Sequence, residues 1–381
     1  MRLKLALLVA AISTATSCGV DNSADTREAG REQVTAALND AVRLGYPGAQ
    51  AVIDDKGHTW TVIAGVGDLA VGKPFPDDSR VRIGSITKTF VATVMLQLVS
   101  EGKVELDAPV ERYLPGAVRG PGIDGNRITI RNLLQHTSGL PEYAAEFGAT
   151  PKPGQLEILT EQVRWGRTDM AEAVRNALTA PADFEPGAQW AYSNTNYALA
   201  GMVIEKITGG SVGAEITHRI IEPLGLRGTY YPDPDETDIR GPHPVGYSEV
   251  GGKRVDYTSQ NVSSAGAAGA MVGTGADLNR FFTALLAGKL LPPVQLAEMK
   301  NVRSIGESSK MAYGLGLIRI WMPCGREFWG HTGGMPGSLT YAGAVPATGR
   351  TVTIALNQDF TDEERSPAGT RALSAAVCPA P

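Results

Sequence analysis

Ser85 and Lys88 have residue types and a spacing that fit nucleophilic catalysis. They lie at the start of an apolar segment, residues 81–98, and side chains three positions apart are neighbours on a helix. A serine hydroxyl needs a base, and lowering a lysine pKa from about 10.4 to about 7 requires about 4.6 kcal/mol. A helix N-terminus contributes about 0.3 to 1 kcal/mol, so desolvation and a cationic neighbour must supply most of the rest. We therefore predict that Ser85 is a nucleophile and that Lys88 is its buried base.

A simpler interpretation makes Ser85 a helix cap and Lys88 a surface lysine. A cation in the first turn opposes the helix dipole, and residues 90–99 leave almost no polar face, which indicates a helix buried on most sides. A second Ser-x-x-Lys pair, Ser100 and Lys103, is interrupted by a glycine that is expected to end the helix. The motif is weak by itself, so the chemistry needs further residues.

Two other segments carry candidate residues. Tyr192 and Asn194 lie in a loop before a predicted helix, and such a loop can present a phenol and an amide to a cleft. The simpler interpretation is that Asn194 caps the helix and that Tyr192 is a packed aromatic. His331 and Thr332 lie in W-G-H-T-G-G at the expected end of a strand, where glycines let a substrate backbone approach. A single histidine in such a run is usually structural.

Three further features do not join the candidate site. His136, in L-L-Q-H-T-S-G-L, follows a predicted helix and is interpreted as structural. Residues 209–213 match the nucleophile-elbow pattern G-x-S-x-G, but a helix precedes Ser211 where the elbow needs a strand, so Gly209 is interpreted as a helix C-cap. The five histidines have no metal-ligand spacing, so neither a metal nor a cofactor is predicted.

Apolar periodicity and turn residues predict the elements that must position these side chains. Besides the segment after Ser85, the predicted helices are residues 27–44, 128–134, 169–178, 196–207, 216–221, 276–286 and 293–302. The predicted strands are residues 49–53, 59–64, 81–83, 312–321, 327–330, 339–345 and 351–356. Strands at both ends of the chain favour an α/β fold, with one antiparallel sheet flanked by terminal helices and an inserted, mostly α domain. The predicted sheet domain comprises residues 31–106 and 267–381, and the α domain comprises residues 107–266.

Composition indicates an exported globular protein. The chain has 381 residues, 43% hydrophobic residues and a formal charge of −5, which gives no support to nucleic-acid binding. Residues 1–17 have the pattern of an export signal peptide, and residues 18–30 form a polar segment suited to a tether. We expect the mature protein to be extracellular or lipid-anchored on the outer face of the cytoplasmic membrane.

Three cysteines leave one without an intramolecular partner. Cys324 and Cys378 lie in segments predicted to be folded and can form a disulfide, which leaves Cys18 for lipidation and membrane attachment. The alternative is a free or signal-derived Cys18. Lipoprotein signals usually have a leucine three residues before the cysteine. Here that residue is Ala15, which weakens the lipoprotein interpretation.

The motifs S-I-T-K, Y-S-N and H-T-G, in this order, are far more specific together than apart. They resemble the three motifs of the serine penicillin-recognising enzymes, a β-lactamase-like family. The longer segments R-I-G-S-I-T-K-T-F, L-L-Q-H-T-S-G-L, Y-S-N-T-N-Y, Y-G-L-G-L and G-H-T-G-G are similar to those of secreted serine D-alanyl-D-alanine carboxypeptidases and their class C β-lactamase relatives. The resemblance extends over residues 31–378 and implies the β-lactamase/DD-peptidase-like fold.

The resemblance also implies roles for the motif residues. Ser85 would be the acylated nucleophile, and Lys88 and Tyr192 would share proton transfer. Asn194 would hold the substrate amide, and His331 would replace a lysine that many relatives carry.

The resemblance places further substrate contacts at Thr332, Gly333 and Gly334. The oxyanion hole would use the backbone N–H groups of Ser85 and Gly334. Gly334 stands where close relatives often carry a hydroxyl residue that binds a terminal carboxylate, and an arginine expected near residue 318 is displaced to Arg319. These departures concern the substrate rather than acyl transfer.

The implied function is an exported, monomeric D-alanyl-D-alanine carboxypeptidase that acts on peptidoglycan stem peptides or another small acyl substrate and is acylated by β-lactams. The alternatives are a β-lactamase or small-ester hydrolase on the same scaffold, and a non-catalytic penicillin- or peptidoglycan-binding lipoprotein. Gly334 predicts modest carboxypeptidase activity and relatively better turnover of neutral esters and thioesters, with Thr332 and Arg319 carrying the remaining recognition.

Overall fold

The computed structural model describes residues 22–145, 150–305, 310–359 and 367–378. The predicted export signal, residues 1–17, and Cys18 lie outside the described residues. Within the described residues, no helix has the length and the apolar content needed to cross a bilayer.

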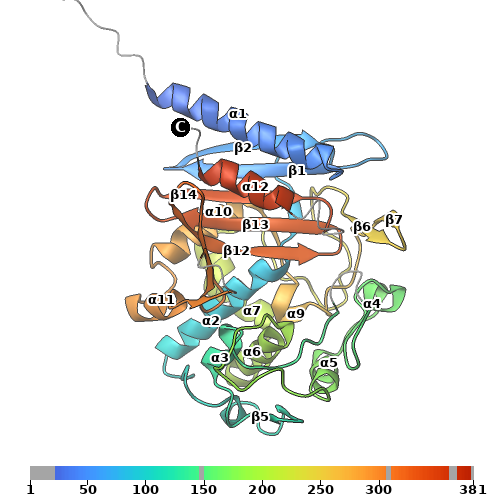
Figure 1. Cartoon of the computed structure of the whole chain (residues 1–381), viewed down its shortest axis with the longest axis vertical. Helices are drawn as coiled ribbons and strands as arrows, with labels where there is room; N and C mark the ends of the chain where they lie inside the picture. The colour runs from blue at the N-terminus through green and yellow to red at the C-terminus, as the bar shows by residue number, and fades with distance from the viewer. Residues whose placement is uncertain (1–21, 146–149, 306–309, 360–366, 379–381) are drawn as a thin grey trace, which may run out of the picture.

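A single eight-stranded sheet forms the centre of the molecule (Figure 1). Its order is β2-β1-β14-β13-β12-β11-β10-β9, and every neighbouring pair is antiparallel. The strands are β1 (Gly48–Asp55), β2 (His58–Gly65), β9 (Arg303–Ser304), β10 (Met311–Tyr313), β11 (Ile318–Trp321), β12 (Glu327–Met335), β13 (Ser338–Val345) and β14 (Arg350–Leu356). The pairing of β1 with β14 confirms that strands from the two ends of the chain share one sheet.

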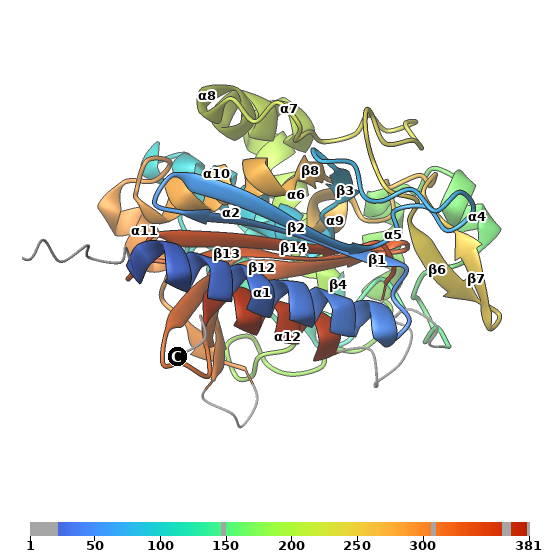
Figure 2. The same ribbon diagram turned by 90° about the horizontal axis from the view of Figure 1, so that it is seen from above.

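The terminal helices α1 (Asn22–Arg43) and α12 (Pro367–Val377) pack together on one face of this sheet (Figure 2). Buried side chains fill the space between these helices and the sheet, among them Leu38, Ile354 and Leu373. Helix α1 begins at Asn22, whereas the sequence predicted a tether through residue 30 and a helix from residue 27. The segment contains no proline and carries Ala, Glu and Arg, which favour helix, so the tether prediction is wrong from residue 22 onward.

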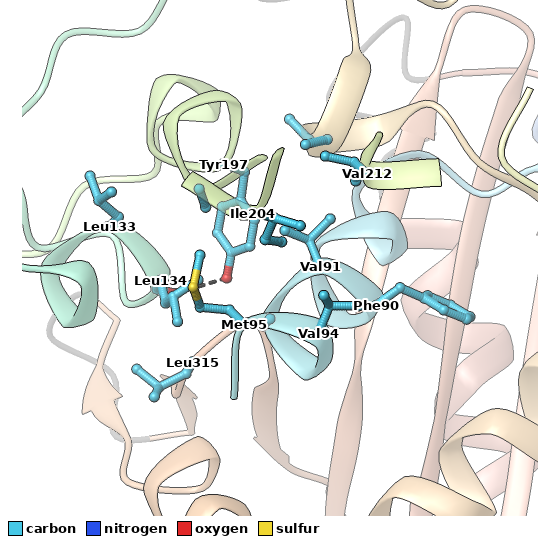
Figure 3. Close-up of a cluster of buried hydrophobic side chains, with 14 of the residues drawn as sticks. Phe90, Val91, Val94, Met95, Leu133, Leu134, Tyr197, Ile204, Val212 and Leu315 are labelled. Carbon is cyan, nitrogen blue, oxygen red and sulfur yellow. Dashed lines mark hydrogen bonds between the residues drawn. The ribbon is translucent and has the colours of Figure 1, made fainter. Parts of the chain in front are cut away.

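Helices α2 (Thr87–Ser100) and α10 (Gly275–Leu286) cover the opposite face (Figure 2). Helix α2 is buried on nearly all sides, as its apolar sequence predicted. It packs among helices α3 (Ile130–Leu134) and α6 (Asn194–Thr208), and a hydrogen bond from the Tyr197 hydroxyl to the Leu134 carbonyl lies within this cluster (Figure 3). The hydrophobic core here includes residues from both predicted domains, so α2 packs with the α segment as well as with the sheet.

The remaining elements surround this core. The helical ones are η1 (Gly84–Ile86), η2 (Val110–Arg112), α4 (Glu161–Trp165), α5 (Met170–Ala177), α7 (Val212–Ile216), η3 (Thr217–Ile221), α8 (Glu222–Leu224), α9 (Gly266–Gly269) and α11 (Pro293–Met299). The minor strand pairs are β3 (Arg80–Arg82) with β8 (Val272–Thr274), β4 (Arg119–Gly120) with β5 (Ile123–Asp124), and β6 (Tyr247–Val250) with β7 (Lys253–Asp256). The described part of residues 107–266 contains short helices, loops and two small hairpins, and its status as a separate domain stays a prediction.

Two predicted strands differ from the structure, and the interpretation of the G-x-S-x-G segment agrees with it. Residues 312–321 form a hairpin, β10 and β11, because Gly316 adopts φ +68° in the turn between them. Strand β12 continues to Met335, so G-H-T-G-G lies within a strand rather than at its end. Gly209 is a left-handed C-cap, and the Ser211 side chain caps α7, which confirms that the G-x-S-x-G match is not a nucleophile elbow.

Cys324, in the β11–β12 connection, forms a disulfide with Cys378, directly after α12. The Cα atoms lie 5.7 Å apart, and the bond ties the C-terminal helix to the sheet, in agreement with the predicted pairing.

Replacing Cys324 and Cys378 together by serine should lower the free energy of unfolding by about 4 kcal/mol, because the bond spans 54 residues and restricts the unfolded chain. Urea unfolding of the oxidised protein measures this difference, with Cys18→Ser as the matched control that should leave the transition unchanged. Non-reducing peptide mapping that finds both thiols free would contradict the assignment.

Candidate active site

Ser85 lies in η1, the short turn that connects β3 to α2. This turn lies directly against strand β12. A Cβ on Gly84 would lie 2.7 Å from the Gly334 nitrogen, and a Cβ on Gly333 would lie 1.9 Å from the Ile83 carbonyl oxygen. Gly84 also adopts φ +52°. Glycine is therefore required on both sides of this contact, which brings the backbone of Ser85 next to that of Gly334.

Lys88 is fully buried in the first turn of α2. Its Nζ has three oxygen partners: Ser85 Oγ at 2.9 Å, Asn194 Oδ1 at 2.7 Å and the Ala268 carbonyl oxygen at 2.7 Å. Burial lowers the pKa of Lys88 to about 7, and the Glu142 carboxylate opposes this shift. A neutral amine has two N–H donors and one lone pair, so it can donate to the amide and carbonyl oxygens while accepting the Ser85 proton. The surface-lysine interpretation is wrong.

Tyr192 contacts the same serine through its hydroxyl. Its hydroxyl lies 2.8 Å from Ser85 Oγ, while the side chain as a whole is 37% exposed. Desolvation at the hydroxyl raises the pKa of Tyr192 above its ordinary value, so the phenol stays protonated at neutral pH. The arrangement therefore places a base, Lys88, and a proton donor, Tyr192, on one hydroxyl.

Asn194 is the first residue of α6, and the preceding residue, Ser193, is its N-cap. The Asn194 side chain accepts the hydrogen bond from Lys88, so the interpretation of Asn194 as a helix cap is wrong. Its backbone N–H donates to Glu142 Oε2 at 2.6 Å. Sequence analysis missed Glu142, whose charge acts on Lys88 and whose own pKa is raised by burial. Its position three residues after the H-T-S-G segment was the available signal.

His331 is buried in β12, on the face that looks toward α2. Its Nδ1 lies 2.5 Å from the Thr332 carbonyl oxygen, which assigns the proton to Nδ1, and its Nε2 then accepts from the Tyr313 hydroxyl at 2.9 Å. Burial, with a smaller effect of Lys88, lowers the pKa of His331 to about 3. The imidazole is therefore neutral, and it carries no positive charge where a lysine would.

Arg319 lies on β11, next to β12, and has Glu327 as its ion-pair partner. It pairs across the sheet with Trp329, which shares a face of β12 with His331. Its Nη1 lies 3.9 Å from Glu327 Oε1. Glu327 is the first residue of β12, at the opposite end of the strand from Gly333. Thr332 is half-buried beside this segment. His136, interpreted as structural, is fully buried next to Tyr192, with the two ring centroids 4.2 Å apart.

Within the described ranges, no group of three or more His, Cys, Asp or Glu side chains is arranged to hold a metal ion. The side chains that meet at Ser85, a hydroxyl, a buried amine and a phenol, are groups that can perform acyl transfer.

Comparison with known proteins gives a consistent result. Residues 29–377 match the beta-lactamase family. A D-stereospecific amidohydrolase from Streptomyces sp. is 39% identical, with a TM-score of 0.83 over 92% of this chain and 99% of that chain. Esterase EstB from Burkholderia gladioli is 36% identical over 183 residues, which cover 47% of this chain and 46% of that protein. The D-alanyl-D-alanine-carboxypeptidase/endopeptidase AmpH from Escherichia coli is 28% identical over 71% of this chain and 68% of that protein.

The rate of Ser85 acylation should rise about tenfold per pH unit up to about pH 7 and stay level above it, because the neutral form of Lys88 is the base. His331 titrates far below this range, and Tyr192 titrates above it. Acylation by a fluorescent penicillin between pH 5 and 9 measures the profile.

Lys88→Ala should abolish acylation while the protein remains folded, and Lys103→Ala, which changes the other Ser-x-x-Lys lysine, should keep the wild-type profile. A flat profile between pH 5 and 8, or acylation of the Lys88→Ala protein, would contradict the assignment of the base.

Proposed function

The chain belongs to the beta-lactamase family of serine hydrolases, and from this premise we propose that it cleaves uncharged D-aminoacyl amides and esters through a Ser85 acyl-enzyme. The observation that carries the proposal is the pair of hydrogen bonds that Ser85 Oγ makes with Lys88 and Tyr192, next to a segment whose histidine is neutral.

The proposed reaction follows from this geometry. Ser85 Oγ attacks the substrate carbonyl carbon while its proton passes to the neutral Lys88 amine, and the backbone N–H groups of Ser85 and Gly334 hold the oxyanion. The Tyr192 hydroxyl gives a proton to the leaving amine or alcohol and recovers one from Lys88. Water then attacks the acyl-enzyme, the acid product leaves, and Ser85 regains its proton. Asn194 binds the substrate amide and also orients Lys88.

The substrate class follows from the charges around residues 331–334. His331 is neutral, Gly334 has no side chain, and Arg319 is directed toward Glu327. None of the three offers a charge-assisted hydrogen bond to a substrate carboxylate, and such a bond is worth about 1.5 to 3 kcal/mol. An uncharged amide or ester loses nothing by its absence. The D configuration is proposed from the likeness to the D-stereospecific amidohydrolase from Streptomyces sp..

A D-alanyl-D-alanine carboxypeptidase is the second candidate function, and the likeness to AmpH favours it. The site would perform this reaction less efficiently, because the terminal carboxylate lacks a cationic partner among the three residues above. A β-lactamase uses the same acylation and differs in the rate of deacylation. A non-catalytic binding protein is disfavoured, because it would not need a fully buried lysine on the serine hydroxyl.

Export is part of the proposal. It relies on the signal-like sequence of residues 1–17. The mature N-terminus would either carry a lipid on Cys18 or carry none. The expected partners are small acyl substrates or peptidoglycan stem peptides, together with β-lactams, and the expected state is a monomer.

Intact-mass analysis after incubation with a penicillin should show one adduct on wild type and none on Ser85→Ala, because the lactam amide mimics the scissile bond. Ser211→Ala is the matched control, since Ser211 lies in the excluded G-x-S-x-G segment and should be labelled like wild type. An adduct that persists in Ser85→Ala and disappears in Ser211→Ala would contradict the assignment of Ser85 as the nucleophile.

The ratio of kcat/KM for a D-aminoacyl p-nitroanilide to that for a D-Ala-D-Ala peptide should exceed one in wild type. Gly334→Thr should raise kcat/KM for the peptide roughly tenfold, by adding a hydroxyl for the carboxylate, and should change the anilide little. Gly334→Ala controls for the added carbon. Wild type that prefers the peptide, with a ratio unchanged in Gly334→Thr, would show that another residue binds the carboxylate.

A further inference from the structure

His136 adopts an unusual backbone conformation at the end of α3. Its φ is +57°, a left-handed value that is unfavourable for a non-glycine residue, and its side chain is completely buried. A buried, polar residue kept in a strained conformation indicates that its contacts matter.

The contacts of His136 fall on both sides of Tyr192. Its carbonyl oxygen accepts the Ala191 backbone N–H at 3.0 Å. Its Nδ1 accepts the Ser193 backbone N–H at 3.2 Å and lies 3.1 Å from Asn196 Nδ2. One residue thus binds the chain immediately before and immediately after Tyr192, and it also binds the first turn of α6.

The imidazole also packs on the Tyr192 ring. The two planes are inclined by 31°, with centroids 4.2 Å apart, and the Tyr313 ring centroid lies 4.8 Å from that of His136. Tyr192 is 37% exposed, so the packing from the protein interior is what fixes the orientation of its ring. The ring orientation determines where the hydroxyl lies relative to Ser85 Oγ.

We propose that His136 is a positioning residue that sets the Tyr192 hydroxyl at hydrogen-bonding distance from Ser85 through its Nδ1 acceptor and its ring. This inference rests on the proposed Ser85 acyl-enzyme and extends it, since His136 touches neither the substrate nor Ser85. It requires a neutral imidazole, because a proton on Nδ1 would oppose the Ser193 and Asn196 donors. Burial, with Lys88 and His331 nearby, holds the pKa of His136 well below its ordinary value.

The test is a double-mutant cycle between His136→Leu and Tyr192→Phe, read as the acylation rate constant and the binding constant for a fluorescent penicillin. His136→Leu should lower the rate constant about a hundredfold and change the binding constant less than threefold, because a displaced proton donor affects the chemical step. In the Y192F background, the same substitution should lower the rate less than threefold, because the group through which His136 acts is already absent.

His136→Asn is the conservative control. Asparagine tolerates positive φ, and its Oδ1 occupies the place of Nδ1, so this variant should keep the rate within about tenfold of wild type. If His136→Leu does not fold, Asn196→Asp gives the same information, because it replaces the Nδ2 donor by a carboxylate without changing shape. It should lower the rate at least tenfold in wild type and less than threefold in the Y192F background.

Equal effects of either substitution in the two backgrounds would overturn the positioning role and leave His136 a structural residue. Wild type that forms no acyl-enzyme at all would instead refute the proposed function. The two failures are therefore distinguishable in one set of measurements.

Discussion

The removal of one amine from water is the constraint on which the rest of the site depends. Moving the Lys88 pKa from 10.5 to about 7 corresponds to about 5 kcal/mol of lost preference for the charged form. This energy comes from the folded protein, because it is burial that disfavours the ammonium. Helix α2 must therefore be enclosed on nearly all sides, and its apolar residues belong to the buried cluster drawn in Figure 3. The lowered pKa of Lys88 therefore depends on the packing of the core around α2.

A second constraint is the close approach of η1 to β12. The nucleophile comes from the N-terminal third of the chain and the oxyanion strand from the C-terminal part, and the two backbones touch at Gly84 and Gly333. A Cβ at either position would collide with the facing backbone, so the backbones of Ser85 and Gly334 could not stay this close. The antiparallel sheet holds this contact, because β12 is fixed by β13 along its length through Met335.

Sequence analysis predicted the parts of the site that repeat a local pattern. The apolar sequence of α2 predicted a buried helix, and the three-residue spacing predicted that Ser85 and Lys88 are neighbours. Glu142 and Tyr313 lie in or next to the quoted segments L-L-Q-H-T-S-G-L and Y-G-L-G-L, but no hydrophobic periodicity places them in the site, because they reach it through a loop and through strand pairing. The extent of β12 differs from the prediction for a related reason: G-H-T-G-G has turn-like composition, and pairing with β13, and with β11 at Gly330, keeps it extended. The start of α1 was misplaced because polar composition was weighed above helix propensity.

A positive charge at residue 331 could both bind a substrate carboxylate and lower the pKa of Lys88. The neutral His331 does neither. A lysine at this position would attract a substrate carboxylate and would also lower the pKa of Lys88 by repulsion between like charges. With a neutral imidazole, the base is activated by burial, and the Glu142 carboxylate acts in the opposite direction. The site therefore keeps its nucleophile active without a cation at residue 331, and a substrate gains no binding energy there from a negative charge. On the proposed function, selection among acyl substrates comes from shape and from neutral hydrogen bonds, and the relatives named above include an esterase, a peptidase and an amidohydrolase.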